Sequence, residues 1–237
     1  MTLDVFLVPV GESRHELYSE STHDDPIGVA EPPAASASWW QRQIARFRAT
    51  LAEADEERRR RDRGEADPAR GGLWRAVMRR IAETIAEQRL LWQLRKHGDA
   101  RLMHPDRMSR DRAVELMRTS LTKDLAKHRR WCVVDALLTA VLGPLFFFVP
   151  GPNVVSWFFF FRAIGHYLAL RGATHGLNVT AWQTQPSPDL TALGEALRLP
   201  RDERRPRLDA IAAALGLEHL TGFVERVSTR SGPGKHT

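Results

Sequence analysis

Three polar side chains stand inside the most apolar stretch of this sequence. Asp135 and Arg162 are the only formal charges between Trp131 and Leu170, and His166 follows Arg162 by four residues. A carboxylate and a guanidinium can form an ion pair, and an imidazole beside them titrates near neutral pH. This combination has two interpretations, a proton- or ion-responsive site and a structural clamp between two helices.

Two apolar segments surround these side chains, residues 131–149 and 154–170. Each is close to the roughly 20 residues that an α-helix needs to cross a bilayer, and runs of phenylalanine make both segments apolar on all sides. The turn between them, which removes two backbone donors and favours a tight reversal, consists of Pro150, Gly151, Pro152 and Asn153. We therefore expect a mainly α protein with a two-helix transmembrane hairpin over residues 131–171.

Within this hairpin, Asp135 on the first arm is expected to face Arg162 and His166 on the second. The two backbones could approach closely because small residues occur on both arms. These helix–helix packing residues are Ala136, Ala140, Gly143, Gly165 and Ala169. Two other interpretations stay open, a buried hairpin in a soluble helical bundle and a hairpin that enters only one leaflet.

Basic residues flank the hairpin at its base and are absent from its turn. His128, Arg129 and Arg130 precede the first arm and Arg171 follows the second, which predicts both termini on the cytoplasmic or matrix side. The net charge of +6 suits anionic lipid headgroups as well as nucleic acid. Lipid is the preferred partner, because the arginines at 58–61 follow acidic residues at helical spacing and part of their field is cancelled.

The rest of the chain divides into five further segments. A β-strand near residues 5–9 is expected to pair with residues 100–104 in a minor two-stranded arrangement. Amphipathic helices are expected at about 35–63, 73–97 and 109–130, the last with Ser109 as its N-cap. The segments are an N-terminal strand and loop (1–22), a Pro/Ala/Ser linker (23–38), a basic helical region (39–130), a C-terminal loop and small helical cap (172–227), and a disordered tail (228–237).

Two separated motifs of the chain together point to a known family. The hairpin carries a Pro-x-Pro-Asn turn, an aromatic run, an Arg-Ala pair, a histidine and an alanine at fixed spacing. These are Pro150, Pro152, Asn153, Arg162, Ala163, His166 and Ala169. The opening strand carries the second motif, with Phe6, Leu7, Pro9 and Tyr18. Both motifs resemble those of the mitochondrial potassium-proton exchange-related family.

This resemblance implies a component or regulator of potassium-proton exchange across an inner membrane. The alternative is a membrane-anchored scaffold whose basic helices bind lipid or a partner protein, with no role in ion movement. Because two helices cannot enclose an ion route, we expect a homo-oligomer or a partner membrane protein. The arginine-rich composition and the lack of a presequence favour a bacterial inner membrane over a mitochondrial one.

No enzyme is indicated by the motifs of the sequence. The nucleophile elbow, the zinc-protease pair of histidines, the paired-cysteine motif and the dinucleotide fingerprint are all missing. The histidines are scattered, and the single cysteine, Cys132, forms no internal disulfide. We therefore expect a protein without catalytic residues, cofactor or metal.

Overall fold

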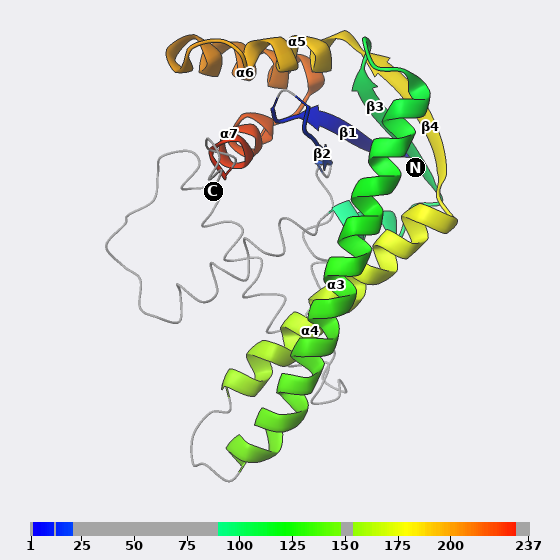
Figure 1. Ribbon diagram of the computed structural model, residues 1–237, viewed down its shortest axis with the longest axis vertical. Helices are drawn as coiled ribbons and strands as arrows, with labels where there is room; N and C mark the ends of the chain where they lie inside the picture. Colours follow the sequence, from blue (N-terminus) through cyan, green and yellow to red (C-terminus); the bar gives the residue numbers. More distant parts are fainter. Residues whose placement is uncertain (1, 12, 21–89, 148–153, 231–237) are drawn as a thin grey trace, which may run out of the picture. The chain divides into compact units, whose positions relative to one another are not determined.

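The computed structural model describes residues 2–11, 13–20, 90–147 and 154–230 (Figure 1). The expected linker at 23–38, the helix at 35–63, most of the helix at 73–97, the hairpin turn at 150–153 and the end of the tail at 231–237 lie outside these residues. Of the helix at 73–97, residues 90–94 are described and are helical.

A four-stranded mixed sheet forms the centre of the described part, with strand order β2-β1-β3-β4. Its strands are β1 (Leu3–Pro9), β2 (His15–Tyr18), β3 (Asp99–Pro105) and β4 (Ala181–Ser187). The β1 strand pairs antiparallel with β2 and parallel with β3, and β3 pairs parallel with β4.

The β1 strand is apolar on both faces because both faces of the sheet are covered. Leu3, Val5 and Leu7 point into one core, while Phe6 and Val8 point into the other. This alternation follows from the two-residue period of a strand. A central strand buried on both sides needs such a continuous apolar run.

The prediction of a minor two-stranded pairing is corrected by this sheet. The expected segments do pair, in parallel, with Val5 opposite Leu102. They form the middle of a larger sheet, because β2 and β4 add an edge strand on either side. We did not predict β4, since its sequence AWQTQPS is mostly polar and exposed and contains a proline, as an edge strand tolerates.

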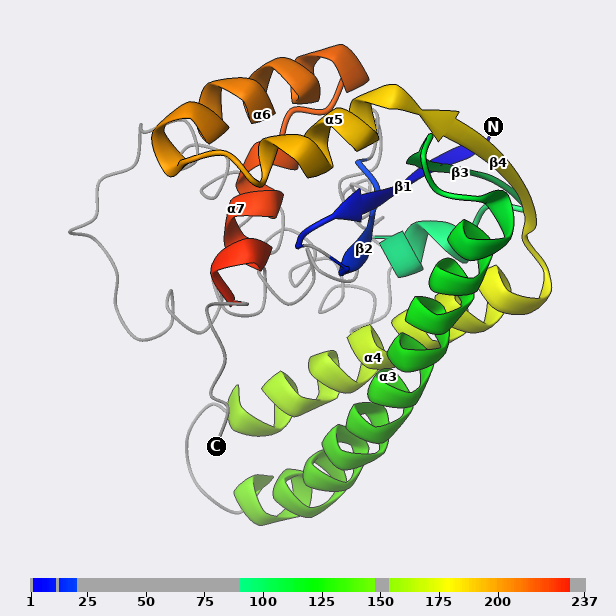
Figure 2. The same cartoon turned by 45° about the horizontal axis from the view of Figure 1, so that its top comes forward.

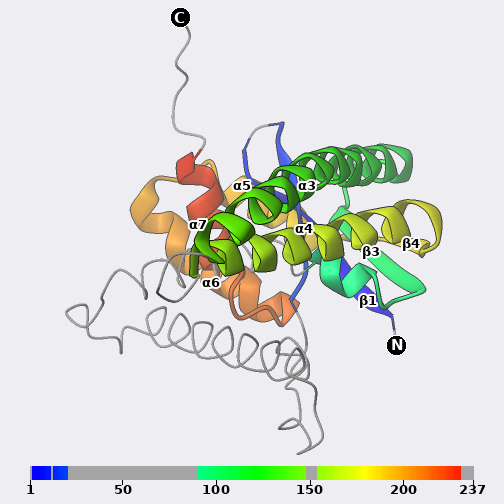
Figure 3. The ribbon, with the colours of Figure 1, turned by 90° about the horizontal axis from the view of Figure 1, so that it is seen from below.

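Two long helices follow β3 and run antiparallel to each other, α3 (Arg110–Phe147) and α4 (Val154–Asn178) (Figure 3). The predicted start of α3 is confirmed, because the Ser109 hydroxyl accepts a hydrogen bond from the Arg112 backbone N–H at 3.3 Å. The second arm was expected to end at Arg171, but α4 continues to Asn178 and leads almost directly into β4.

The predicted two-helix transmembrane hairpin is wrong: among the described residues, no helix combines the length and the apolar character needed to cross a bilayer. From the predicted arms, Ala169 of α4 is buried in the same core as Leu102. Met117 and Leu121 of α3 and Ala173 of α4, which lie outside the predicted arms, are buried there as well. The fold is therefore a mixed sheet with helices on both faces, and not a mainly α transmembrane hairpin.

Three shorter helices cover the opposite face of the sheet, as Figure 2 shows. They are α5 (Pro188–Ala196), α6 (Arg201–Leu215) and α7 (Leu220–Arg230). The α6 helix ends at Gly216, whose positive φ of 68° is the left-handed conformation that glycine adopts at low cost. Leu190, Leu193 and Leu208 of α5 and α6 pack against Val8 of β1 in the second core.

Candidate functional site: a buried polar cluster between α3 and α4

Asp135 and Arg162 form an ion pair across the two long helices. The distance from Arg162 Nε to Asp135 Oδ2 is 3.0 Å. The Asp135 side chain is fully buried, at 0% exposure, while the Arg162 side chain is 30% exposed. A buried carboxylate is strongly disfavoured without a charged partner, so this pair constrains how α3 and α4 meet.

Two histidines extend the cluster away from the ion pair. His166 Nε2 lies 3.5 Å from the same oxygen, Asp135 Oδ2, and its other ring nitrogen, Nδ1, lies 2.8 Å from Nδ1 of His128. Both imidazoles are buried. The side chains therefore form a continuous series from Asp135 through His166 to His128.

The protonation states within this series depend on one another. Two facing ring nitrogens can form a hydrogen bond only when one carries a proton and the other does not. The Asp135 carboxylate favours the tautomer of His166 with its proton on Nε2, which makes Nδ1 of His166 the acceptor. His128 then donates through its Nδ1–H, and its Nε2 holds a lone pair that can take up a further proton.

Burial keeps both imidazoles neutral. It lowers the pKa of His128 to about 4, and the positive fields of His166 and Lys127 act in the same direction. Burial also lowers the pKa of His166; the Asp135 carboxylate opposes this shift, whereas Arg162 and Lys127 add to it. The histidine pair is therefore uncharged at pH 7 and takes up protons only in acid.

Arg162 has a second neighbour besides the carboxylate. Its guanidinium carbon lies 5.2 Å from the centre of the Trp131 ring, within the range of a cation–π contact. On the α3 side, Asp135 Oδ1 is buried and has no hydrogen-bond partner in the described part of the chain. The carboxylate thus makes both of its contacts to cationic or titratable groups through Oδ2.

The structure brings together the three polar residues that the sequence grouped, Asp135, Arg162 and His166. It adds His128, which we placed only among the basic residues at the hairpin base. His128 precedes Asp135 by seven residues, or about two helical turns, and this spacing puts both on one face of α3. This seven-residue spacing could have predicted that His128 joins the cluster. We instead grouped His128 with the adjacent arginines as a basic flank.

The small residues that were predicted to pack the two helices against each other differ in their exposure and in their contacts. Ala136 and Ala140 are exposed, and Gly143 is half-buried. Ala169 is buried in the sheet-side core, and the Gly165 carbonyl accepts a hydrogen bond from Trp92 Nε1 at 3.4 Å. The close approach of α3 to α4 instead involves Cys132, whose Sγ lies 3.7 Å from the Ala163 carbonyl oxygen.

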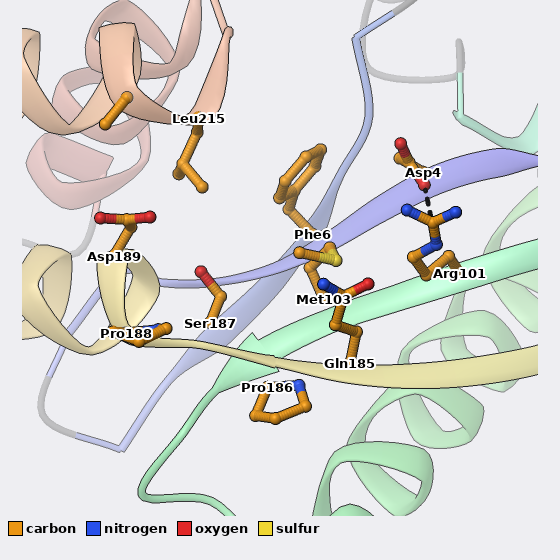
Figure 4. Close-up of a pocket in the computed structure, with 11 residues that line it drawn as sticks. Asp4, Phe6, Arg101, Met103, Gln185, Pro186, Ser187, Pro188, Asp189 and Leu215 are labelled. Atoms are coloured by element: carbon orange, nitrogen blue, oxygen red, sulfur yellow. Dashed lines mark ion pairs between the residues drawn. The ribbon is translucent and has the colours of Figure 1, made fainter.

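A separate pocket of about 340 Å³ lies beside the sheet, next to α5 and α6 (Figure 4). Its walls include an ion pair between Asp4 and Arg101 at 3.6 Å, and the side chains of Met103, Gln185 and Leu215. Ser187, which also lines it, caps α5 by accepting the Leu190 backbone N–H. None of the predicted site residues contributes to this pocket, so it carries no part of the site.

The fold and the cluster define an α/β protein whose long helical pair encloses a carboxylate, a guanidinium and two imidazoles. The chain belongs to the mitochondrial K+-H+ exchange-related family, whose model matches residues 4–179, more than half of the sequence. The family predicted from the sequence motifs is thereby confirmed. No protein of curated function matches the chain, and no solved structure does. The matched region ends after α4, before β4 and the three C-terminal helices begin.

Proposed function

We propose that this protein is a component or regulator of potassium-proton exchange at an inner membrane. Membership in the K+-H+ exchange-related family supports a connection with this process. The observation that carries the proposal is the contact series from Asp135 through His166 to His128, which joins the two long helices through groups that bind protons.

Proton uptake by this cluster would change the contact between α3 and α4. A first proton on His128 Nε2 leaves the hydrogen bond between the two Nδ1 atoms intact. A second proton on the pair places one N–H against another at 2.8 Å, which is repulsive, so the rings must separate. The cluster is therefore suited to converting acidification into a shift of one helix relative to the other.

The proposed role is regulatory or accessory rather than that of a complete carrier. Secondary transporters build their ion sites within bundles of several membrane-spanning helices. We therefore propose that the protein acts with further copies of itself or with a membrane-spanning partner. Its Asp135–Arg162 pair would hold the carboxylate in place beside the histidines, while Lys127 and Arg162 lower the pKa of His166 and so delay its protonation until the pH falls.

The proposal is tested by potassium-driven proton release in inner-membrane vesicles from cells with and without the gene. We expect deletion to lower the proton flux most strongly at about pH 4 to 5, as the pH approaches the pKa of His128, which is about 4. The wild-type protein should restore the flux. His166→Gln and His128→Asn should restore only a flux that no longer changes with pH across this range.

His219→Gln is the matched control, since this half-buried histidine at the start of α7 is outside the cluster. It should behave as wild type. Unchanged flux after deletion, at every pH tested, would refute a role in exchange and favour the alternative of a scaffold without an ion role. A pH response that survives both cluster substitutions would remove the histidine pair from the mechanism.

A further inference from the structure

One exposed stripe of α3 changes from basic to apolar along the helix axis. Its members recur at alternating spacings of four and three residues, which places them on a single face. In order, they are Lys123, Lys127, Arg130, Val134, Leu137 and Val141. The stripe points away from α4, because Asp135 and His128 occupy the opposite side of α3.

The apolar half of this stripe is unusually exposed for residues of its type. Leu137 is 61% exposed and Val141 is 64% exposed, and the neighbouring Val133 and Val134 are exposed as well. Trp131 lies at the point where the basic half ends, and it is also exposed. Adjacent large apolar side chains on one surface mark a contact with another molecule or a membrane more often than single ones do.

The charges on the same part of α3 are almost all positive. Between Met117 and Val134 the exposed charged residues are Arg118, Lys123, Lys127, Arg129 and Arg130, and the single acidic residue, Asp124, is half-buried. Anionic headgroups attract such a belt, and the attraction grows with each basic residue near the surface. Aromatic side chains such as Trp131 favour the boundary between headgroups and acyl chains.

A second copy of the chain fits this stripe poorly. In a parallel pairing the three basic residues of one stripe would face those of the other. In an antiparallel pairing basic side chains would face the exposed leucine and valines, which offer them no counter-charge. A lipid surface matches both halves at once, with acidic headgroups beside the basic half and acyl chains beside the apolar half.

We propose that the Lys123–Val141 stripe of α3 docks on an anionic phospholipid surface and inserts its apolar end into one leaflet. Arg130 and Val141 are separated by about 16 Å along the helix at 1.5 Å per residue. One leaflet contributes about 15 Å of hydrocarbon. This attachment needs no helix that crosses the bilayer, and it does not depend on the proposed role in exchange.

The one charged side chain of α3 near the inserted end among the described residues, Asp135, is directed inward. Asp135 is fully buried and is neutralised by Arg162, which lies beside Trp131. The polar atoms of the cluster therefore do not interrupt the apolar face of α3. Docking would also bring the histidine pair close to the headgroups, because His128 lies within the basic half of the helix.

Sedimentation of the full chain with vesicles, with and without phosphatidylglycerol, tests the proposal. Leu137→Glu with Val141→Glu should weaken binding at least about a hundredfold, because two apolar side chains lose their burial in the leaflet. Val179→Glu is the matched control, as this valine is 62% exposed but lies outside the stripe. It should bind as wild type does.

The double substitution Lys127→Gln with Arg130→Gln tests the basic half of the stripe. Its control is Arg205→Gln with Arg207→Gln, which removes the same amount of charge from α6. Only the first pair should weaken binding, and only when phosphatidylglycerol is present. Insertion is read out by an environment-sensitive dye on Leu137→Cys in a Cys132→Ser background. Its emission should shift to the blue on vesicles, whereas dye on Val179→Cys should not shift.

Three results would overturn the proposal. The first is that Leu137→Glu with Val141→Glu leaves vesicle binding unchanged, or that Val179→Glu weakens vesicle binding by the same factor. Another is no emission shift at position 137 while the protein sediments with vesicles. The third is that the protein self-associates without lipid, and that the stripe substitutions abolish this self-association but not vesicle binding. That result would show that the stripe contacts a second copy of the chain. Each of these results concerns lipid binding alone, so the proposed role in potassium-proton exchange is tested separately.

Discussion

Asp135 holds Arg162 and His166 through one oxygen atom, and this makes it the residue on which the cluster depends most. Replacing it by asparagine keeps the volume but leaves the guanidinium without a counter-charge. Because Arg162 is partly exposed, water will offset some of the loss. We expect Asp135→Asn to lower the free energy of unfolding by about 2 kcal/mol in urea denaturation.

The double substitution Asp135→Leu with Arg162→Met should recover most of that loss, since removal of both charges leaves no buried ion without a partner. Asp209→Asn, on the exposed face of α6, serves as the surface control and should change stability by less than about 0.5 kcal/mol. A double variant less stable than Asp135→Asn would show that the pair itself stabilises the hairpin strongly.

The histidine pair predicts a pH dependence of stability with a defined sign. The pKa of His128 is about 4 in the folded protein and 6.5 when unfolded, so the unfolded chain binds more protons between these values. Stability should therefore fall as the pH falls from 6.5 to 4, by on the order of 3 kcal/mol, and then level off. Urea denaturation at several pH values measures this slope.

His128→Asn should flatten this slope, because asparagine keeps an amide near the position of Nδ1 but does not titrate. Asp124 contributes with the opposite sign, since burial raises its pKa to about 6, Lys127 opposes that shift and Glu16 adds to it. Its contribution is common to both proteins and cancels in the comparison. An equal slope in wild type and His128→Asn would place the pH dependence elsewhere.

At the scale of elements, the contact of α4 with residues 90–94 leaves no space for a side chain at Gly172. A Cβ there would overlap the Leu91 carbonyl oxygen, which is a backbone atom and cannot move without a shift of the segment. Gly172→Ala should therefore cost about 3 kcal/mol or displace this segment from α4. The melting temperature and the fluorescence of Trp92 would report the change.

Gly98→Ala is the matched control, because a Cβ at Gly98 meets no atom within 4 Å. Its effect should be within about 0.5 kcal/mol. Should Gly172→Ala prove as stable as Gly98→Ala, the close approach of the two backbones would be refuted.

Local sequence signals identified several elements correctly. Ser109 predicted the start of α3, and the apolar run around Val5 predicted a strand, which the structure places inside the sheet and not at its edge. The membrane-spanning hairpin was wrong for a physical reason. Hydropathy records that Ala169 is apolar but not whether lipid or another part of the protein covers it, and here the sheet-side core does. His128 was missed because tertiary packing, not its sequence neighbours, buries it.

At the scale of the whole described part, Glu20 connects the beginning of the chain to its end. Its carboxylate accepts hydrogen bonds from the backbone N–H groups of Glu218 and His219, at 2.7 and 2.6 Å, just before α7 begins. It also accepts the Tyr18 hydroxyl. A carboxylate at this place caps the helix and complements its dipole.

We expect Glu20→Ala to cost about 1 kcal/mol and to speed amide hydrogen exchange in α7 more than in α3. Glu115→Ala is the control, as within the described residues its carboxylate pairs with exposed Arg112 on the same helix and with no other group. Equal exchange rates in α7 for wild type and Glu20→Ala would show that the cap contributes nothing to that helix.

The strand order has a consequence for how the protein is made. Among the described strands, β1 is synthesised first and is one of the two central strands, but its parallel neighbour β3 begins at Asp99 and the edge strand β4 only at Ala181. At about 5–20 residues per second, β1 waits several seconds before β3 is synthesised. During that interval, β2 is the one strand among the described residues that can pair with the valines and leucines of β1, so the nascent chain would expose them to chaperones that hold apolar segments.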